Sequence, residues 1–491
     1  MTTAKSPSSP VASLKDRHCK IIGTLGPASS DDATLRELIE SGLNIARLNF
    51  SHGDHAFHLA NIERIRRLSR ETGKNVAILQ DLQGPKIRVG KLSNGELELR
   101  NGQEYWLQFG FEQTRADVIP IDYRGLVHDV AEGQRVMMDD GLYILEVVKV
   151  DRDEGVKVVV REGGILKNRK GVNFPDSKLS LPAMTDKDSK DLLFGIANRV
   201  EFVALSFVQD PSDIRHIKSM IQALGSDVPV IAKIEKLPAL THINEIARMS
   251  DGLMVARGDL GVEANVERVP GFQKVIIEAA VKHSKPVIIA TQMLESMVKN
   301  PKPTLAEVAD VANGVLDGAD CLMLSAEVAS GKYPVQCVAK MASIIDQVES
   351  WTFNQPSRFA MHTNATEFDD WQEHESIAVA ACEAAEALKA KAIVCLTLTG
   401  SIARCIAKWR PNTSIIAVSP RPEIVQRLTL VWGLRGIQNP SFYNTDNLLQ
   451  GIPQLLKELR VVESGDIIII TAGLPLDKMR PTNMVKINRI P

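Results

Sequence analysis

The stretches VIAKI at Val230–Ile234 and GLMV at Gly252–Val255 decide the fold of this chain. Each is a short apolar run that ends in polar residues and precedes a helical pattern, which is typical of a buried parallel strand followed by a crossover helix. Six more such runs are Cys19–Leu25, Ile45–Phe50, Val76–Asp81, Phe202–Phe207, Pro286–Ala290 and Cys321–Leu324. Amphipathic stretches between them include Asp32–Glu40, Ala56–Arg70, Asp186–Asn198, Ser212–Leu224 and Gly271–Lys282. Eight such units predict an α/β fold, a closed (β/α)8 TIM barrel over residues 17–86 and 183–350.

The spacing of these strands is broken once, between Val76–Asp81 and Phe202–Phe207. In this gap the hydrophobic pattern changes to a period of two, at Glu96–Arg100, Tyr105–Phe109 and Leu142–Val150. We therefore expect residues 87–182 to form an inserted all-β domain, a β-barrel. Because the insertion follows the third strand, it leaves the barrel at the carboxyl ends of the strands and is placed to act as a lid.

Both ends of the chain differ from the barrel. The Ser/Pro-rich residues 1–16 indicate a flexible arm, and residues 351–373 lose periodicity as a linker would. After the linker, strand-like and helix-like stretches alternate, which predicts an open α/β domain over residues 374–491. Its expected strands are Ala392–Leu396, Ser414–Val418 and Asp466–Ala472, and its expected helices are Ser376–Leu388, Ile402–Lys408, Glu423–Leu430 and Asn447–Arg460.

Composition narrows the classes of function. The chain has 58 Lys+Arg against 60 Asp+Glu, a formal charge of -2, so it lacks the positive field that favours nucleic-acid binding. No apolar run approaches the roughly 18 residues of a membrane span, and no secretory signal begins the sequence. The six cysteines show neither C-x-x-C spacing nor the density of a disulfide scaffold. We expect a cytoplasmic protein without membrane or nucleic-acid partners.

The strand ends of the predicted barrel are unusually polar. In Lys233-Ile-Glu235 the alternation of a strand directs the ammonium and the carboxylate to the same side. Asp259, at the end of the next strand, can complete a two-carboxylate site for Mg²⁺, which prefers oxygen ligands. Gly258 and Gly261 allow the backbone to approach an anion. Taken singly, each feature also has a structural explanation as an ion pair, cap or surface loop, but six strand ends carry such groups, which favours a functional site.

Several long phrases identify a family. They are ARLNFSHG at Ala46–Gly53, DLQGPKIRVG at Asp81–Gly90, KGVNFP at Lys170–Pro175, AKIE at Ala232–Glu235, MVARGDLG at Met254–Gly261, ATQML at Ala290–Leu294 and LSAEVASGKYP at Leu324–Pro334. In these phrases, and in their order, the chain resembles the pyruvate kinase family over roughly residues 17–491. The resemblance implies transfer of the phosphoryl group of phosphoenolpyruvate to ADP, giving pyruvate and ATP, with a C-terminal regulatory domain.

The resemblance also implies roles for the strand-end residues. Arg47 and Lys233 would act on the phosphoryl group, with Lys233 also at the developing enolate oxygen. Glu235 and Asp259 would hold Mg²⁺, with Mn²⁺ as a possible substitute. Thr291, Gly258 and Asp259 would hold the substrate carboxylate. The proton donor to the enolate stays open between Thr291 and a water chain near Ser325 and Glu327.

Nucleotide contacts are implied for Asn49, Arg88 and Lys170, the last two at the junctions of the insertion. Many relatives bind potassium through groups that match Asn49, Ser51, Asp81 and the residue after Asp81, with a Glu where this chain has Lys86. We predict that the Lys86 ammonium replaces the ion, so that potassium is not required. The alternative is a Lys86 that is merely exposed at the hinge.

The loop Thr397-Leu-Thr399-Gly400-Ser401 joins a predicted strand to a helix and offers hydroxyls and N–H groups to a phosphate. The family places a phosphorylated effector there, and without the resemblance the loop reads equally well as an ordinary turn with a helix cap. We expect activation by a sugar phosphate or a nucleotide monophosphate, and a homotetramer. Two other functions share part of this pattern: a catalytically silent metabolite-binding regulator, and a phosphoenolpyruvate-using aldolase or lyase. The intact Lys233, Glu235, Asp259 and Thr291 argue against the first, and the inserted and C-terminal domains against the second.

Overall fold

The computed structural model describes residues 17–177, 179–353, 373–439, 445–474 and 481–491. The predicted arm 1–16 and residues 354–372 of the predicted linker lie outside this part of the chain. Internal contacts divide the chain into two compact units. The first unit comprises Met1–Gln80, Asn198–Phe202 and Ala280–Pro491, and the second comprises Asp81–Ala197 and Val203–Ala279.

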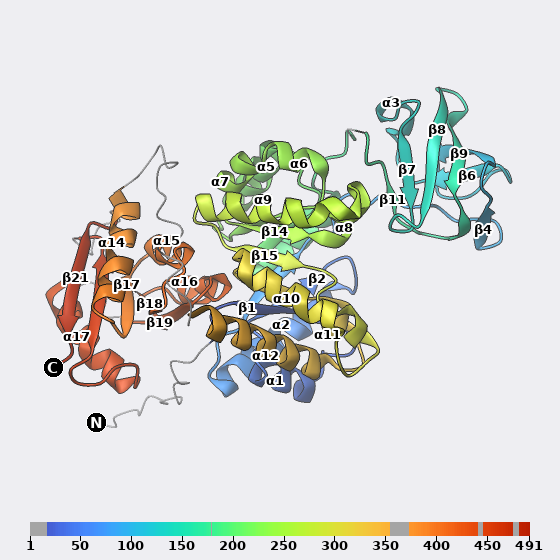
Figure 1. Cartoon of the computed structure of the whole chain (residues 1–491). Helices are drawn as coiled ribbons and strands as arrows, with labels where there is room; N and C mark the ends of the chain where they lie inside the picture. Colours follow the sequence, from blue (N-terminus) through green and yellow to red (C-terminus); the bar gives the residue numbers. More distant parts are fainter. Residues whose placement is uncertain (1–16, 178, 354–372, 440–444, 475–480) are drawn as a thin grey trace. The chain divides into compact units, whose positions relative to one another are not determined.

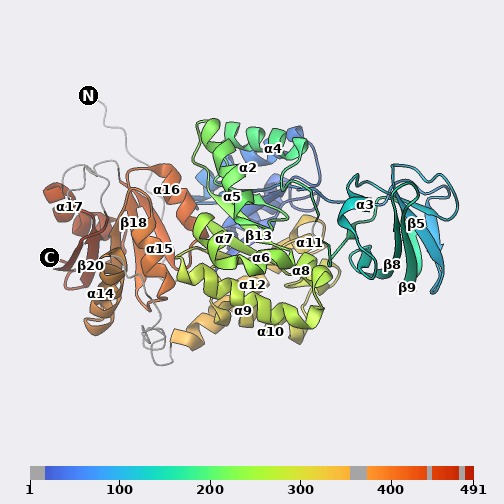
Figure 2. The ribbon, with the colours of Figure 1, turned by 90° about the horizontal axis from the view of Figure 1, so that it is seen from above.

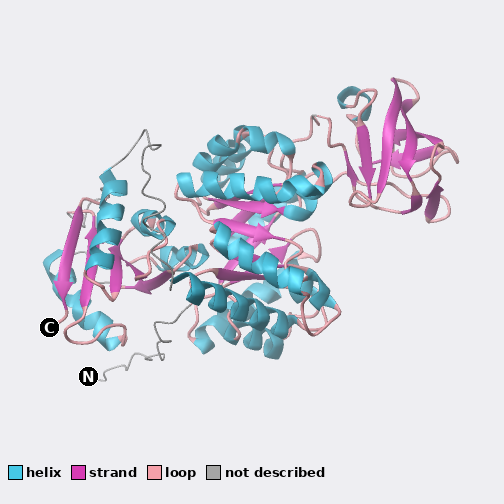
Figure 3. Cartoon of the chain, in the orientation of Figure 1, coloured by secondary structure: helices cyan, strands magenta, loops and turns pink. Residues whose placement is uncertain are grey.

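Eight strands form a closed barrel, which confirms the predicted fold class. Around the barrel the order is β1 (Lys20–Thr24), β2 (Ile45–Asn49), β3 (Ala77–Asp81), β12 (Phe202–Leu205), β13 (Val230–Ile234), β14 (Gly252–Ala256), β15 (Val287–Ala290) and β16 (Cys321–Leu324). β1, β3, β12, β14, β15 and β16 are buried along their whole length, as expected of strands covered on both faces. Figure 3 shows barrel strands in magenta among cyan helices.

Four barrel helices, α1, α2, α5 and α10, begin after a residue whose side chain accepts a hydrogen bond from the first turn. Asp31 caps α1 by accepting from Thr34 N, and Thr304 and Glu307 form a reciprocal capping box at the start of α10. The barrel helices are α1 (Asp32–Glu40), α2 (His55–Thr72), α4 (Asp186–Ala197), α5 (Pro211–Ala223), α6 (Leu237–Thr241), α7 (Ile243–Met249), α8 (Arg257–Glu263), α9 (Val269–Lys282), α10 (Leu305–Asp317), α11 (Ala326–Ala329) and α12 (Pro334–Phe353). The helical stretches predicted for the barrel all fall on these elements.

The inserted segment is all-β apart from the short α3 (Leu126–Asp129), and appears in teal in Figure 1. Its strands are β4 (Glu96–Leu99), β5 (Glu104–Phe109), β6 (Val118–Ile121), β7 (Arg135–Met138), β8 (Tyr143–Asp151), β9 (Gly155–Glu162), β10 (Gly164–Lys167) and β11 (Val172–Asn173). Strand pairing gives a six-stranded sheet, β11-β7-β8-β9-β5-β6, and a two-stranded sheet, β10-β4, in the segment predicted to be a β-barrel. Buried side chains such as Leu107, Val136, Leu145 and Val158 form the core of this segment.

The C-terminal region is an open α/β layer, as predicted. Its helices are α14 (Glu373–Ala387), α15 (Ser401–Lys408), α16 (Pro422–Arg427) and α17 (Thr445–Glu458), and its sheet has the order β19 (Leu434–Gln438), β18 (Ser414–Ser419), β17 (Ala392–Leu396), β20 (Ile467–Ala472), β21 (Met484–Arg489). Figure 2 shows α14 and α17 on opposite sides of this sheet. The two edge strands β19 and β21 were not predicted. Polar residues and a glycine interrupt β19, and polar residues interrupt β21, so neither sequence has the continuous apolar run of the central strands.

Among the described residues no helix combines the length and the apolar character that a membrane crossing requires.

Candidate active site

Lys233 lies at the centre of a buried ionic cluster formed by the ends of three neighbouring strands. Its Nζ is 2.7 Å from Glu235 Oε1, 3.2 Å from Asp81 Oδ1 and 2.6 Å from Ser206 Oγ. Asp81 ends β3, Ser206 follows β12, and Lys233 and Glu235 are at the end of β13, in the barrel order β3-β12-β13. The Lys233 side chain is 12% exposed, and those of Asp81 and Glu235 are 1% and 2% exposed. We name Asp81, Ser206, Lys233, Glu235 and the adjacent Asp259 the mouth cluster.

Glu235 is a carboxyl group of the mouth cluster whose pKa is raised. Burial is the main cause that raises its pKa, Lys233 opposes the shift, and the carboxylates of Asp259 and Asp81 add to it. Phe207 N donates to Glu235 Oε2 at 3.2 Å. The cluster thus holds three carboxylates against one ammonium, an excess of negative charge in a buried place. This donor set fits a divalent cation that prefers oxygen, because such an ion would relieve the repulsion that Asp259 and Asp81 exert on Glu235.

Asp259 is positioned by the helix that follows β14. It lies in the first turn of α8, where the partial positive charge of a helix N-terminus favours a carboxylate. The backbone from Arg257 on is helical, so the N–H of Gly258 lies in the first turn of that helix. Asp259 is close enough to raise the pKa of Glu235, which in turn pairs with Lys233, and all three residues belong to the second unit.

Other predicted substrate residues belong to the first unit. Arg47, on β2, donates from Nη1 to Thr24 Oγ1 at 2.9 Å. Thr291, directly after β15, donates from Oγ1 to Ala290 O at 2.6 Å. Thr291 and the next residue, Gln292, have φ values of 71° and 55°, a left-handed backbone that is strained for a β-branched residue.

The candidates for proton donation also lie in the first unit. Glu327 is fully buried and accepts from Ser325 N at 2.7 Å and from Leu294 N at 3.2 Å. Through Leu294 this carboxylate is tied to the loop that begins at Thr291. At the end of β2, Asn49 Oδ1 accepts from Ser51 N at 3.1 Å, so these two predicted ion-site residues contact each other.

The predicted nucleotide contacts Arg88 and Lys170 meet at the base of the inserted segment. Arg88 Nη1 donates to Arg169 O at 3.0 Å, and Arg88 forms a β-bridge with Gly171. Lys170 Nζ is 2.8 Å from Asp139 Oδ1, and this hydrogen bond raises the pKa of Lys170. Arg88 and Lys170 therefore lie on adjacent backbone segments of the second unit.

Lys86 lies at the hinge between barrel and inserted segment. Its side chain packs over Gly171. A Cβ added at Gly171 would lie 3.2 Å from Lys86 Cε and 3.8 Å from both Lys86 Nζ and Asp140 Oδ1, so a larger residue there would press on Lys86. Lys86 and Asp259 also line the same pocket, together with Phe207 and Lys236. The ammonium that contacts Asp81 in the structure is that of Lys233.

The C-terminal loop predicted to bind an effector is hydrogen-bonded within itself. Thr397 Oγ1 accepts from Gly400 N at 2.8 Å, and the hydroxyls of Thr399 and Ser401 are 3.1 Å apart. Gly400 has a φ of 78°, which a residue with a side chain rarely adopts, and α15 begins directly after it. Arg404 donates to Thr399 O at 3.3 Å and brings a cation to the loop, a contribution that the sequence did not reveal.

A second ionic cluster lies where the C-terminal region meets the starts of barrel strands within the first unit. Asp320 pairs with Arg410 through both of its oxygens, at 3.1 and 3.2 Å. The same carboxylate accepts from Trp432 N at 2.9 Å and from Val287 N at 3.0 Å. We name these four residues the base cluster. One carboxylate meets one guanidinium and two N–H groups there, so its charge is balanced by the protein.

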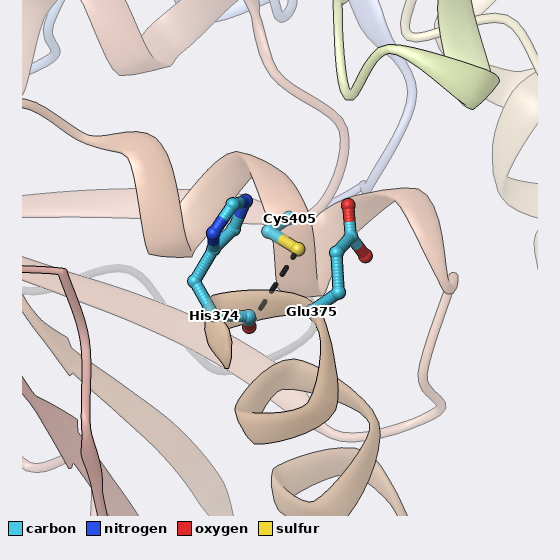
Figure 4. Close-up of side chains that lie close together, drawn as sticks. All are labelled: His374, Glu375 and Cys405. Carbon is cyan, nitrogen blue, oxygen red and sulfur yellow. Dashed lines mark hydrogen bonds between the residues drawn. The ribbon is translucent and has the colours of Figure 1, made fainter. Parts of the chain in front are cut away.

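His374, Glu375 and Cys405 form a third group, shown in Figure 4. Their possible ligand atoms lie within 4.8 Å of one another. Glu375 is already paired with Lys408, whose Nζ is 2.5 Å from Oε1, and burial raises the pKa of the Cys405 thiol. A cation would have to displace both Lys408 and the thiol proton, so this group suits a metal less well than the mouth cluster does.

Sequence reasoning missed three residues of the second unit that complete its site: Ser206, Lys236 and Glu263. Ser206 donates to Leu82 O at 2.7 Å and accepts from Lys233, which orients the ammonium. Lys236 and Glu263 form a buried ion pair next to Glu235. The only sequence signal was their position beside the matched phrases, AKIE for Lys236 and MVARGDLG for Glu263.

Comparison with known proteins gives a consistent result. Residues 16–338 match the barrel domain of pyruvate kinase, and residues 375–488 match its alpha/beta domain. Pyruvate kinase 2 of Synechocystis sp. is 44% identical over 476 residues, which cover 96% of this chain and 79% of that protein. The pyruvate kinase of Staphylococcus saprophyticus is 42% identical, with 96% and 80% covered.

Solved structures agree. The crystal structure of a pyruvate kinase from Cryptosporidium parvum aligns with a TM-score of 0.91 at 35% identity, over 99% of both chains. Fold, matched phrases and relatives thus lead to one conclusion. The chain belongs to the pyruvate kinase family and is a phosphotransferase of that type.

Proposed function

We propose that the mouth cluster transfers the phosphoryl group of phosphoenolpyruvate to ADP with the aid of a divalent cation. The observation that carries this proposal is the single Lys233 ammonium set among the carboxylates of Asp81, Glu235 and Asp259. Glu235 and Asp259 would hold Mg²⁺, or Mn²⁺ in its place, and the ion would supply positive charge to the substrate oxygens.

The side chains of this chain would position the substrate and stabilise charge. In the transfer, the bond between phosphorus and the enol oxygen of phosphoenolpyruvate breaks, and a bond forms to the terminal phosphate oxygen of ADP. Lys233, held by Ser206, would stabilise the transferring group and the enolate oxygen left behind. Arg47 would bind the phosphate, while Thr291 and the N–H groups at Gly258 and Asp259 would hold the substrate carboxylate.

The enolate becomes pyruvate when its methylene carbon gains a proton. Thr291 and a water chain ending at Ser325 and Glu327 are the two candidate donors. The hydrogen bond from Leu294 N to Glu327 links these candidates, since Leu294 is on the loop that begins at Thr291. On the nucleotide side, Asn49, Arg88 and Lys170 would contact ADP, and movement of the inserted segment would exclude water.

The test is a lactate-dehydrogenase-coupled assay with phosphoenolpyruvate, ADP and Mg²⁺. We expect NADH oxidation that requires all three. A pure, folded chain that binds phosphoenolpyruvate but produces no pyruvate would instead support the silent regulator. For the proton donor, Thr291→Val and Glu327→Gln would be compared for incorporation of solvent deuterium into pyruvate.

We also propose that potassium is dispensable because Lys86 supplies the monovalent charge. Its position supports this, since Lys86 lines a pocket together with Asp259. In tetramethylammonium buffer the wild-type chain should keep its turnover, and Lys86→Glu should lose it until potassium is added. A wild-type enzyme that is inactive without potassium would refute the proposal.

For regulation, we propose that the loop of Thr397, Thr399, Gly400 and Ser401 binds a phosphorylated metabolite, with Arg404 as an added cation. A sugar phosphate or a nucleotide monophosphate should lower the half-saturating concentration of phosphoenolpyruvate. Thr399→Ala and Ser401→Ala should abolish that shift without changing the unactivated rate. A homotetramer is expected, and light scattering of the purified chain would measure the assembly.

A further inference from the structure

Glu263 joins three segments of the second unit through one buried carboxylate. Its Oε1 is 2.5 Å from Lys236 Nζ and accepts from Asn173 Nδ2 at 2.8 Å. The Glu263 side chain is 2% exposed and that of Lys236 is 11% exposed. Glu263 ends α8, Lys236 follows β13, and Asn173 ends β11 of the inserted segment.

This contact has an energetic reason to be specific. A buried carboxylate is stable only if it is paired and hydrogen-bonded, and here both donors reach the same oxygen. The Lys236 ammonium also lies 5.8 Å from the centre of the Phe207 ring, which restricts its position further. If Asn173 moves away, Glu263 loses a buried hydrogen bond, so the pair favours one position of the inserted segment.

Each segment carries a residue of the proposed site. Lys236 is next to Glu235, and α8 carries Asp259, so Glu263 connects to both metal carboxylates. Asn173 is three residues from Lys170, and Val172 N donates to Ile87 O at 3.0 Å beside Arg88. The pocket lined by Lys86, Val172, Asn173, Lys236 and Asp259 lies along the same seam.

We propose that Glu263 is a positioning residue that fixes the inserted segment to the end of β13, and so aligns the nucleotide contacts with the metal carboxylates. This inference rests on the proposed function of those residues. The main expected effect of losing Glu263 is on nucleotide binding. If the inserted segment is correctly placed in only a fraction of the molecules, the apparent affinity for the nucleotide falls by that fraction.

The first variant is Asn173→Ala, which leaves the Lys236–Glu263 ion pair intact and so should fold. We expect the KM for ADP to rise about tenfold, as when only about a tenth of the molecules are binding-competent, while the KM for phosphoenolpyruvate changes less than about twofold. If Asn173 had a merely structural role, Asn173→Ala would lower the unfolding temperature and kcat and would leave the KM for ADP unchanged.

Glu263→Ala removes the acceptor of the same hydrogen bond and also the partner of Lys236, so the KM for ADP should rise at least as much as in Asn173→Ala. The double variant should have the KM for ADP of Glu263→Ala, because the Asn173 contact is already lost there. Additive effects on the KM for ADP would overturn the proposal. Asp176→Asn is the matched control: Asp176 is also in the inserted segment, and its carboxylate accepts from Arg135 of the same segment, at 2.8 Å from Nη2. It should leave the KM for ADP at the wild-type value.

Amide hydrogen exchange separates this proposal from the proposed function. The amide of Val172 should exchange faster in Asn173→Ala and in Glu263→Ala than in the wild type. In Asp176→Asn it should exchange at the wild-type rate. If the wild type makes no pyruvate but the exchange pattern appears, the proposed function fails and the positioning role stands. Wild-type exchange in Asn173→Ala would refute the role whatever the activity.

Discussion

The mouth cluster and the base cluster are both buried ionic groups at the ends of barrel strands, but their charges balance differently. At the mouth, Lys233 meets the carboxylates of Asp81 and Glu235, with Asp259 nearby. At the base, Asp320 meets Arg410 and two backbone N–H groups. The difference teaches that burial and ion pairing alone do not identify a catalytic site. Neighbouring carboxylates that raise the pKa of one of their number do, because a bound cation would relieve the repulsion between them.

The largest expected effect is on turnover, and it should separate the two clusters. Lys233→Met should lower kcat by about 10³-fold, the scale of losing a preorganised group at the developing charge. Arg410→Met, which removes the cation of the base cluster, should leave kcat within about twofold. The coupled assay measures both. Comparable losses of kcat in the two variants would mean that charge balance does not distinguish function from structure.

Stability should show the reverse order. Arg410→Met leaves Asp320 buried without its counter-ion and should lower the free energy of unfolding by about 3–5 kcal/mol. Urea unfolding of the Mg²⁺-bound enzyme measures this. Arg410→Lys keeps the charge and is the control, with a smaller loss. If Lys233→Met were the less stable of the two, the base cluster would not be the structural one.

The pH dependence of metal binding should sharpen the comparison further. Burial raises the folded-state pKa of Glu235 above its ordinary 4.5, so the metal-free folded chain gains stability from this group below pH 4.5 and loses it as pH rises through the raised pKa. Mg²⁺ must displace that proton, so its apparent affinity should fall up to about tenfold per pH unit as pH drops below the raised pKa.

The measurement is a Mg²⁺ titration followed by thermal unfolding at several pH values, with Asp320→Asn as the control from the base cluster. Glu235→Gln should bind Mg²⁺ weakly and without this pH dependence. A Mg²⁺ affinity that is flat with pH in the wild type would show that Glu235 is already ionised.

The smallest effect is expected for Ser206→Ala. Ser206 holds Lys233 at 2.6 Å through a hydroxyl, so its loss should loosen the ammonium and lower kcat about three- to tenfold, with little change in stability. Steady-state kinetics and thermal unfolding measure both quantities. Restoration of kcat in Ser206→Thr, which keeps a hydroxyl, would support the orienting role, whereas a wild-type kcat in Ser206→Ala would exclude it.

The sequence predicted the parts of the fold that have a local cause. Buried strands such as Val287–Ala290 are apolar throughout, and helices such as Asp32–Glu40 begin after a capping residue, so both can be recognised from a few neighbours. The pairing of β10 with β4 and the edge strands β19 and β21 depend on partners distant in the chain. Hydrophobic periodicity carries little information about such partners.

The same distinction applies to the site. Lys233 and Glu235 share a strand and were predicted together, whereas Ser206 joins them from the neighbouring strand β12. Asn173 and Glu263 are 90 residues apart, and neither has a pattern of its own. Their contact exists only because the inserted segment returns to the barrel.

The left-handed backbone at Thr291 has a consequence for engineering this enzyme. A β-branched residue in that conformation costs roughly 1–3 kcal/mol, so a library selected for heat resistance should be enriched in glycine there. Glycine would remove the hydroxyl proposed to hold the substrate. Selection for thermal resistance alone would therefore discard catalysis at this position, and a useful screen has to demand turnover in every round.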